Sequence, residues 1–393
     1  MTKGAGSVIV TDAALRTALY TIRSLGRRGV RVTAVERAGS GDGNLGAVSR
    51  YVTRRETVPD NHTDPAGFAD ALLQLAPGHD VLFPIGMHSV FAVAGRAGAF
   101  LDRIGLALAP LETIALADDT RRLLDLAREL GIPQPRRFRR ADFPDVDALV
   151  RELPLPAIIK TGIEAGLPPR DRYAVVRTPG EVRSALDRLG KVTHDLIIQE
   201  LVEGDGIGVE MLYDFDGRAV ASFCHRRLRE YPLTGGPSTY CESIRHPVAE
   251  FHARALLDHL RWTGLAMVEF KIDARTGEPK LMEINPRPWG SMALPIAAGT
   301  DFPWLAFQLA RDKRLAPQPH PRAGVRLRFL ITDLQAALAQ SRGAAGLGGR
   351  LAPFLPLLDP RVHEGVLKLG DPRPSYAYLR KAFRALRAGA DAF

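Results

Sequence analysis

The strongest constraint on the fold is a pair of strand-like segments, 266–273 and 279–285, separated by a short glycine-containing turn. Polar and apolar residues alternate in both segments, which predicts two β-strands joined as a hairpin. Side chains alternate between the two faces of a strand, so Glu283 and Asn285 share one face. The hairpin can bring Glu269 beside them. The sequence therefore predicts two carboxylates and an amide gathered on one side of a sheet.

This predicted cluster of oxygens has the composition of a magnesium site. Carboxylate and amide oxygens are hard ligands that suit Mg²⁺, and a magnesium ion bound in this way usually also bridges substrate phosphates. Arg287 follows Asn285 by two residues, where a cation can hold a transferring phosphoryl group. The alternative is a sheet edge whose acidic side chains are solvated.

Three further segments carry candidate ligands. An apolar strand at 197–201 runs into the acidic, glycine-containing turn 203–206, which can offer backbone groups to a nucleotide base. Lys160 ends a buried-looking strand and is a candidate phosphate ligand, with a surface lysine as the alternative. The basic run 225–229 leads into the glycine pair at 235–236, a candidate anion cradle or an exposed strand and its turn. His225 in that run is either a base or a structural residue.

The N-terminal region predicts a parallel sheet. Residues 7–10, 13–29 and 30–35 read as strand, helix and strand, an alternation typical of a Rossmann-like unit that ends near Pro110. After Pro317 the composition changes to a glycine-rich stretch, a proline-interrupted stretch and a basic helix.

Composition excludes several classes of protein. The chain has 393 residues, 46% hydrophobic and 25% charged, which is ordinary for a globular protein. Its two cysteines provide no disulfide framework, and no apolar run is long enough for a membrane span. The net charge is +9, but the arginines are scattered, which disfavours a nucleic-acid-binding face. No signal peptide precedes the first strand, so we expect a cytoplasmic protein.

In combination, these segments resemble the ATP-grasp superfamily. The resemblance rests on Lys160 at a strand end, on the string Gln-Glu-Leu-Val-Glu-Gly at 199–204 and on the string Glu-Ile-Asn-Pro-Arg at 283–287. The hairpin resembles the metal-binding hairpin of the carbamoyl-phosphate synthetase and biotin carboxylase branch. The strings 225–238 and 285–291 are similar to a branch of predicted carboxylate–amine ligases.

The resemblance implies a fold of α/β and α+β class. It spans roughly residues 5–318 and implies a Rossmann-like pre-ATP-grasp domain followed by a two-lobed ATP-grasp fold. We place the first domain at 1–112 and the ATP-grasp domain at 113–318, with a lid subdomain at about 150–203. A basic C-terminal extension follows at 319–393.

The family also implies roles for single residues in binding ATP. Lys160 would hold the phosphates, the backbones of Glu200 and Val202 would contact adenine, and Asp205 would contact the ribose. Two Mg²⁺ ions are expected, with Mn²⁺ as an alternative. Their ligands would be Glu269, Glu283 and Asn285.

The same resemblance implies the catalytic groups. Arg287 would steady the transferred phosphate, Arg227 would be a second cation, and Ser291 would lie near the acceptor.

The sequence departs from the family pattern in two places. Asp119 and Thr120 stand where the family often has a lysine or arginine, so either Arg121 is the substitute or one phosphate contact is missing. The loop 161–166 matches the family's glycine-rich lid loop poorly.

The implied activity is that of an ATP-dependent ligase. A carboxylate would attack the γ-phosphate of ATP to give an acyl-phosphate and ADP. The amine of an amino acid or small peptide would then displace phosphate and form an amide. One alternative is an enzyme of the biotin carboxylase or carbamoyl type that uses bicarbonate. The other is a non-catalytic ATP-binding or nucleic-acid-binding protein. We expect a small carboxylate and an amine as partners and no membrane partner, and leave a homodimer open.

Overall fold

The computed structural model describes residues 5–40, 44–162, 169–233 and 236–387. They form two compact units. Unit 1 comprises Met1–Ala115, Ile207–Val268 and Ile284–Phe393, and unit 2 comprises Leu116–Gly206 and Glu269–Glu283. The chain therefore leaves unit 1 and returns to it twice, and strands β12 and β13 each belong partly to both units.

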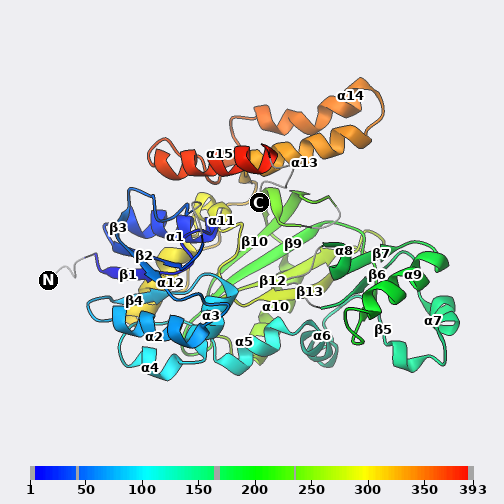
Figure 1. Cartoon of the computed structure of the whole chain (residues 1–393), viewed down its shortest axis with the longest axis horizontal. Helices are drawn as coiled ribbons and strands as arrows, with labels where there is room; N and C mark the ends of the chain where they lie inside the picture. Colours follow the sequence, from blue (N-terminus) through cyan, green and yellow to red (C-terminus); the bar gives the residue numbers. More distant parts are fainter. Residues whose placement is uncertain (1–4, 41–43, 163–168, 234–235, 388–393) are drawn as a thin grey trace. The chain divides into compact units, whose positions relative to one another are not determined.

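Unit 1 begins with a parallel sheet in the order β3-β2-β1-β4, which confirms the predicted Rossmann-like start (blue to cyan in Figure 1). Val8 and Val10 of β1 pack into one core with helix α1, whereas Ile9 packs into a second core with α2 and α3. Helices therefore cover both faces of this sheet, as expected for parallel strands. Its elements are β1 (Ser7–Val10), α1 (Arg16–Gly26), β2 (Arg31–Arg37), β3 (Val52–Val58), α2 (Pro65–Leu75), β4 (Val81–Phe83), α3 (Met87–Ala94), α4 (Ala97–Leu101) and α5 (Leu111–Asp118).

A second, mixed sheet has the strand order β13-β12-β9-β10-β11-β14-β15. Its middle strands are antiparallel to one another, and β14 and β15 are parallel. The elements of this part of the chain are β9 (Gly206–Tyr213), β10 (Ala219–Glu230), β11 (Ser238–Ile244), α10 (Pro247–His259), β12 (Gly264–Ile272), β13 (Pro279–Asn285), α11 (Ala293–Ala298), α12 (Phe302–Asp312) and β14 (Arg326–Arg328).

Unit 2 contains a smaller antiparallel sheet in the order β5-β8-β6-β7. Helices α7 and α9 pack on one face of it, where Leu149, Val182 and Leu189 meet Ala157 and Ile159. Side chains alternate, so Ile158 and Lys160 point to the opposite face. The elements are α6 (Thr120–Glu129), β5 (Arg137–Phe138), η1 (Arg140–Asp142), α7 (Val146–Glu152), β6 (Ala157–Lys160), α8 (Pro169–Arg172), β7 (Tyr173–Val176), α9 (Pro179–Gly190) and β8 (Ile197–Glu200).

The C-terminal residues are an integral part of unit 1, so the structure does not confirm a separate C-terminal extension. Phe329, Val366 and Tyr378 are buried in the same core as α1. The Arg23 guanidinium of α1 donates to Asp371 over 2.9 Å, and both side chains are buried. The elements are α13 (Leu330–Gly343), α14 (Gly346–Leu351), η2 (Ala352–Leu358), β15 (His363–Glu364) and α15 (Pro372–Arg387). Within the described residues, every helix is too short or too polar to cross a bilayer.

Candidate functional site

The predicted hairpin is formed by β12 and β13, which are neighbours in the mixed sheet. Glu269 lies on β12 and is half-buried, whereas Glu283 lies on β13 and is exposed. Asn285 ends β13 two residues after Glu283, on the same face of that strand. Two carboxylates and an amide oxygen in this arrangement fit the ligand preference of Mg²⁺. No group of three or more His, Cys, Asp or Glu that could hold a metal occurs in the described ranges, and the predicted set needs only two carboxylates.

A buried ion network in unit 2 holds this hairpin to the end of β8. The Lys280 ammonium of β13 lies 2.5 Å from Glu200 Oε1 and 2.9 Å from Asp273 Oδ2. Arg275 in the hairpin turn donates to both oxygens of Asp273. Its Nη2 atom also forms an ion pair with Glu200 Oε2 at 3.7 Å. Glu200 and Lys280 are 80 residues apart in sequence. The side chain of Glu200 is therefore engaged with the hairpin, and its amide donates to the Arg136 carbonyl.

The charges of this network shift its pKa values in the directions that favour the ionised forms. Hydrogen bonds from Arg275 and Lys280 hold the pKa of Asp273 well below its usual range. Burial is the largest single effect on the pKa of Glu200 and raises it, but the hydrogen bonds from Lys280 and Arg136 and the charges of Lys280 and Arg275 together lower it, so the net shift is downward. Burial acts to lower the pKa of Lys280, and its two carboxylate partners raise it overall. All three groups are charged at neutral pH.

The turn between β8 and β9 packs directly on the hairpin. The Ile272 amide donates to the Asp205 carbonyl over 2.9 Å, and the Ala274 amide donates to the Glu203 carbonyl over 2.8 Å. Gly204 has a φ of 144°, and a Cβ there would lie 1.8 Å from the Ile272 carbonyl oxygen. Only glycine permits this approach. On either side of it, Val202 is buried and Asp205 is exposed.

Lys160 ends β6 on the sheet face opposite α7 and α9. It pairs with Ile197 at the start of β8, whereas Ala157 pairs with Glu200 at the end. Three residue steps therefore separate Lys160 from the Glu200 end of the strand pair, or about 10 Å. The predicted lid residues 163–166 lie outside the described residues. Arg121, the predicted substitute cation, pairs with Asp195 at 2.6 Å.

In unit 1, Arg227 lies on β10 and pairs with Glu230 at 3.2 Å. His225 lies on the same face of β10, completely buried, with its Nδ1 2.6 Å from Glu210 Oε1 of β9. Burial raises the pKa of Glu210, and the charge of His225 opposes that shift. The burial of His225 favours the structural alternative. The glycine pair of the predicted anion cradle falls partly at residues 234–235, outside the described residues.

The segment after β13 is anchored by a tryptophan. Trp289 is fully buried, meets the Phe302 ring edge-on at 5.1 Å, and its carbonyl accepts a hydrogen bond from Thr17. Arg287, two residues earlier, is half-buried, and its Nη1 donates to the Pro288 carbonyl over 3.1 Å. Ser291 is buried two residues later, and its carbonyl accepts the Leu294 amide at the start of α11. The tryptophan fixes the chain that carries both predicted catalytic residues.

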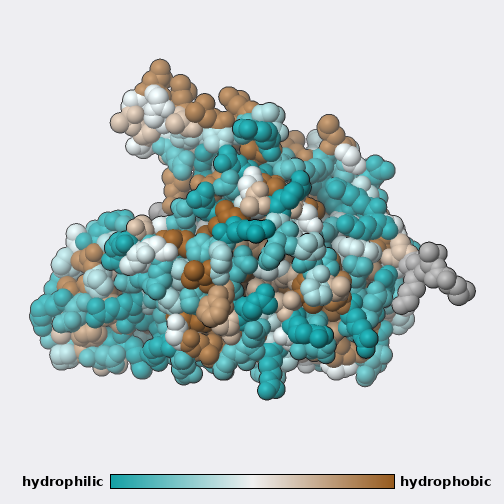
Figure 2. Space-filling view, turned by 180° about the vertical axis from the view of Figure 1, so that it is seen from behind, coloured by the Kyte–Doolittle hydropathy of each residue, from teal (hydrophilic) through white to brown (hydrophobic). Residues whose placement is uncertain are grey.

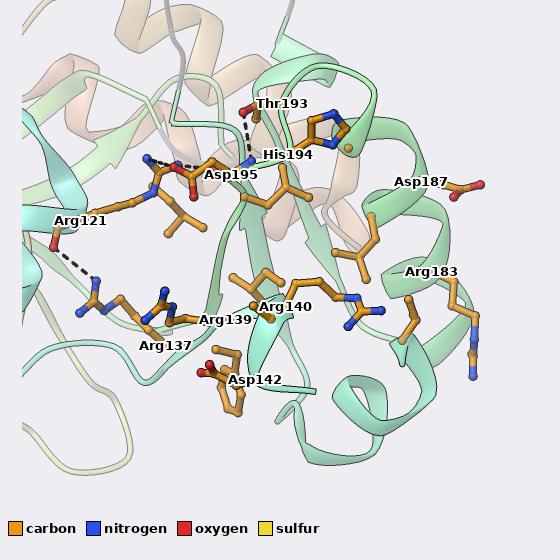
Figure 3. A pocket seen from close by; sticks show the side chains of 18 of the residues that line it. Arg121, Arg137, Arg139, Arg140, Asp142, Arg183, Asp187, Thr193, His194 and Asp195 are labelled. Carbon is orange, nitrogen blue, oxygen red and sulfur yellow. Dashed lines mark hydrogen bonds and ion pairs between the residues drawn. The ribbon is translucent and has the colours of Figure 1, made fainter. Parts of the chain in front are cut away.

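A separate cavity of about 1230 Å³ opens in unit 2 (Figure 3). Arg139 and Arg140 lie near its centre in this view, and Asp195 and His194 border it. Arginines and aspartates are equally numerous among the lining residues, and several pair with one another, such as Arg137 with Asp125. Arg121, the predicted substitute cation, lines this cavity, whereas the residues predicted to bind ATP, magnesium and the acceptor do not. Its mutually neutralised charges give no reason to place the phosphates of a nucleotide there.

Sequence reasoning missed Lys280 and Asp273, which position the hairpin. The alternation in 279–285 contained a signal for Lys280, because it places this lysine on the face opposite Glu283. A lysine whose neighbours on the same strand face are apolar, here Met282 and Ile284, requires an acidic partner when it is buried. The identity of that partner, Glu200, depends on the tertiary fold.

Comparisons with known proteins show what the chain is similar to. The family described as ATP-grasp in the biosynthetic pathway with Ter operon matches residues 192–332. The carbamoyl phosphate synthase large chain of Thermoplasma acidophilum is 25% identical over 225 residues, 54% of this chain. The match covers 21% of that protein, so the chain spans about a fifth of its length.

Two solved structures share the fold. The biotin carboxylase domain of Hydrogenobacter thermophilus 2-oxoglutarate carboxylase, in complex with MgADP, ADP and bicarbonate, has a TM-score of 0.62 at 16% identity, covering 82% of this chain and 73% of that one. The L-amino acid ligase of Bacillus licheniformis has a TM-score of 0.59 at 17% identity, covering 82% and 77%. At 16% and 17% identity, these two likenesses show the fold of the chain.

Proposed function

We propose that the chain is an ATP-dependent carboxylate–amine ligase of the ATP-grasp type, a proposal supported by the family match at residues 192–332 and by the shared fold. The observation that carries the proposal is the β12–β13 hairpin, with Glu269 on one strand and Glu283 and Asn285 on the next. The Lys280 network that ties this hairpin to the end of β8 supports a nucleotide site formed around both.

The proposed nucleotide site uses main-chain groups for the base. The Glu200 side chain is engaged by Lys280 and its amide by Arg136, so its carbonyl is the group we assign to adenine. Val202 would donate its amide, and the exposed Asp205 would accept hydrogen bonds from the ribose. Lys160, about 10 Å along the strand pair, would meet the phosphates. The ADP complex of the 2-oxoglutarate carboxylase domain supports a nucleotide as ligand.

Glu269, Glu283 and Asn285 would hold magnesium. A bound magnesium ion supplies Lewis-acid stabilisation of the phosphate charge. The MgADP in the related carboxylase domain supports this metal, and Mn²⁺ and the number of ions stay predictions.

The proposed reaction has two steps. A substrate carboxylate oxygen bonds to the γ-phosphorus as the bond from that phosphorus to the β,γ-bridging oxygen breaks, and ADP leaves with that electron pair. An amine nitrogen then bonds to the acyl carbon, phosphate leaves, and the nitrogen loses a proton. The Lys160 and Arg287 cations would reduce the repulsion between the carboxylate and the triphosphate. Arg227 and Ser291 are proposed on the acceptor side.

The related L-amino acid ligase supports an amino acid as the substrate. The carboxylase complex with bicarbonate supports a second candidate function, that of a bicarbonate-dependent enzyme.

We expect phosphate release that requires both a carboxylate and an amine. A panel of amino acids and short peptides tests this, first alone and then in pairs. Hydroxylamine replaces the amine in a parallel series, because it displaces phosphate from an acyl-phosphate to give a hydroxamate, which is detected as its coloured complex with added ferric iron.

The control is the Glu283→Gln variant, which preserves shape and removes one charged ligand. Phosphate release that depends on bicarbonate and needs no amine would contradict the ligase and favour the second candidate. Nucleotide binding without turnover on any pair in the panel would favour a non-catalytic binder.

A further inference from the structure

The C-terminal helices of unit 1 carry an apolar surface. Leu347, Leu351, Leu355 and Leu358 on α14 and η2 are 75%, 55%, 65% and 79% exposed. Leu347 and Leu351 lie on one face of the α-helix α14, and Leu355 and Leu358 lie on one face of η2, because residues three apart align in a 3-10 helix. Figure 2 shows hydrophobic residues gathered at its upper left, where these helices project. Single exposed leucines are common, but several exposed apolar side chains close together are typical of interaction surfaces.

A second apolar stripe lies on α15. Tyr376, Leu379 and Phe383 are exposed and are spaced three and four residues apart, on one side of that helix. The opposite side, with Tyr378 and Ala382, is buried against the protein. The buried side chains Tyr378 and Ala382 attach α15 to the protein, so the exposed apolar side chains are not needed for that attachment. Figure 1 shows α13, α14 and α15 as one layer of helices in orange and red.

Basic side chains accompany both stripes. Arg350 lies between two of the leucines, and Arg384 and Arg387 lie beside Phe383, all of them exposed. The Arg387 guanidinium lies over the Phe383 ring at 4.6 Å. The aspartates of this region pair with arginines: Asp333 with Arg229, Asp359 with Arg361 and Asp371 with Arg23. The surface around the apolar stripes is therefore positively charged.

The helices that carry the leucines are firmly attached. Arg229 of β10 donates to Asp333 of α13 over 2.9 Å, and both side chains are buried. The same guanidinium donates to the Pro353 carbonyl of η2 over 2.8 Å. The Thr239 hydroxyl of β11 donates to Asp333 as well. These bonds fix η2 on the sheet while its leucines face water.

We propose that α14, η2 and α15 form a docking surface for an anionic lipid bilayer. Leucines and aromatic side chains enter the boundary between headgroups and acyl chains, and arginines bind the anionic headgroups. A second copy of the chain would bring an identical positive surface against this one. A nucleic acid would satisfy the arginines but leave the leucines in water. Charge complementarity together with the apolar stripes therefore favours the lipid surface.

This inference goes beyond the proposed ligase activity and does not depend on it. It also revises the expectation of no membrane partner, which was based on the lack of a spanning segment. Peripheral binding needs no such segment.

Co-sedimentation of the full chain with vesicles tests the proposal. We expect binding to vesicles of phosphatidylcholine with 30 mol% phosphatidylglycerol (about a third anionic), and far weaker binding to phosphatidylcholine alone. Binding should weaken as salt screens the arginines. The double variant L351Q/L355Q should lose about a hundredfold in affinity, because each leucine contributes roughly tenfold when it leaves water. R384E should weaken binding to anionic vesicles only.

The matched control is Phe251→Gln, which removes an exposed aromatic side chain from α10, 68% exposed and outside the C-terminal helices. It should bind vesicles like the wild type, and circular dichroism should show that every variant is folded. Wild-type protein that fails to sediment with anionic vesicles would overturn the proposal. So would L351Q/L355Q that binds normally. Self-association that L351Q/L355Q abolishes, without vesicle binding, would assign the surface to a second copy, and equally tight binding to duplex DNA would assign it to nucleic acid.

Discussion

Lys280 illustrates how one side chain joins parts of the chain that are far apart in sequence. It is buried between Glu200 and Asp273, and its charge is matched by theirs. A buried charge without a partner is strongly unfavourable, so each member of the network depends on the others. The network therefore determines the position of the β12–β13 hairpin relative to β8.

Asp273→Asn tests this network through its pH dependence. The pKa of Asp273 is depressed in the folded protein, so its ionised form stabilises the fold above the unfolded pKa of about 3.9, and this contribution is lost as pH falls through the folded pKa. We expect the variant to be about 3 kcal/mol less stable at pH 7, and the difference to shrink below about pH 4. Urea unfolding between pH 3 and 7 measures it. Glu278→Gln, an exposed change in the same turn, is the control, and an equal loss at every pH would contradict the assignment.

Glu283→Gln tests the proposed metal site. Glutamine keeps the shape of the side chain but removes one negative charge, so we expect phosphate release to fall by about 10²-fold or more, with little change in melting temperature. The measurement is turnover as a function of Mg²⁺ concentration. Near-normal turnover at limiting Mg²⁺ would remove Glu283 from the site.

Lys160→Ala tests the proposed phosphate contact. The side chain lies at a strand end on the face opposite the helices, so its removal should leave the fold intact. Calorimetric titration should show about tenfold weaker ATP binding, since one charge-assisted contact to phosphate is lost. Unaltered affinity would place Lys160 on the surface, the alternative that the sequence left open.

At the scale of elements, the β8–β9 turn and the β12–β13 hairpin act as one support. Two main-chain hydrogen bonds join them, and Gly204 allows their backbones to touch. The strands themselves were predictable, because each alternates in sequence. The packing of the turn against the hairpin was not predictable, because a glycine in a turn sequence gives no information about which segment contacts it.

Gly204→Ala tests this contact between elements. A Cβ there would overlap the Ile272 carbonyl, so the backbones must separate, and we expect a loss of about 2 kcal/mol or more together with weaker ATP binding. Gly277→Ala is the control, since Gly277 also has a positive φ of 72° but no atom within 4 Å of its added Cβ. The control should cost about 1 kcal/mol. Equal losses of stability in chemical unfolding would show that the close approach is unimportant.

At the scale of the whole molecule, the C-terminal residues complete unit 1. Asp371 accepts from Arg23 of α1, from the Ser49 hydroxyl and from the Arg50 amide. Phe329 and Tyr378 fill the core that α1 began more than 300 residues earlier. The composition change after Pro317 indicated a separate extension, but a change in composition contains no information about what a segment packs against.

Asp371→Asn tests the integration of the C-terminal residues. Removing the charge leaves the buried Arg23 guanidinium without its partner, and we expect a loss of about 3 kcal/mol in unfolding free energy and faster proteolysis of residues beyond β14. Asp359→Asn breaks an ion pair with the exposed Arg361 and should cost less than about 1 kcal/mol. If the two variants unfold alike, the C-terminal residues are held by apolar packing alone.

The sequence by itself determined the fold class and predicted the residues of the β12–β13 hairpin that we propose bind magnesium. Both depend on patterns within short segments. The order strand, helix, strand in residues 7–35 indicates the fold class, and the alternation of polar and apolar residues in 279–285 places Glu283 and Asn285 on one face of a strand. The family resemblance and the fold class drawn from these patterns are confirmed. The roles of the single site residues stay predictions.

Only the tertiary structure decided which distant residues meet. The pairing of Lys280 with Glu200, the burial of Asp371 and the exposure of the leucines on η2 each depend on surfaces brought together from separate parts of the chain. A leucine stripe at helical spacing looks the same in sequence whether it packs on a sheet or faces water. The physical reason is that periodicity specifies the face of an element, whereas burial depends on what the folded chain places against that face.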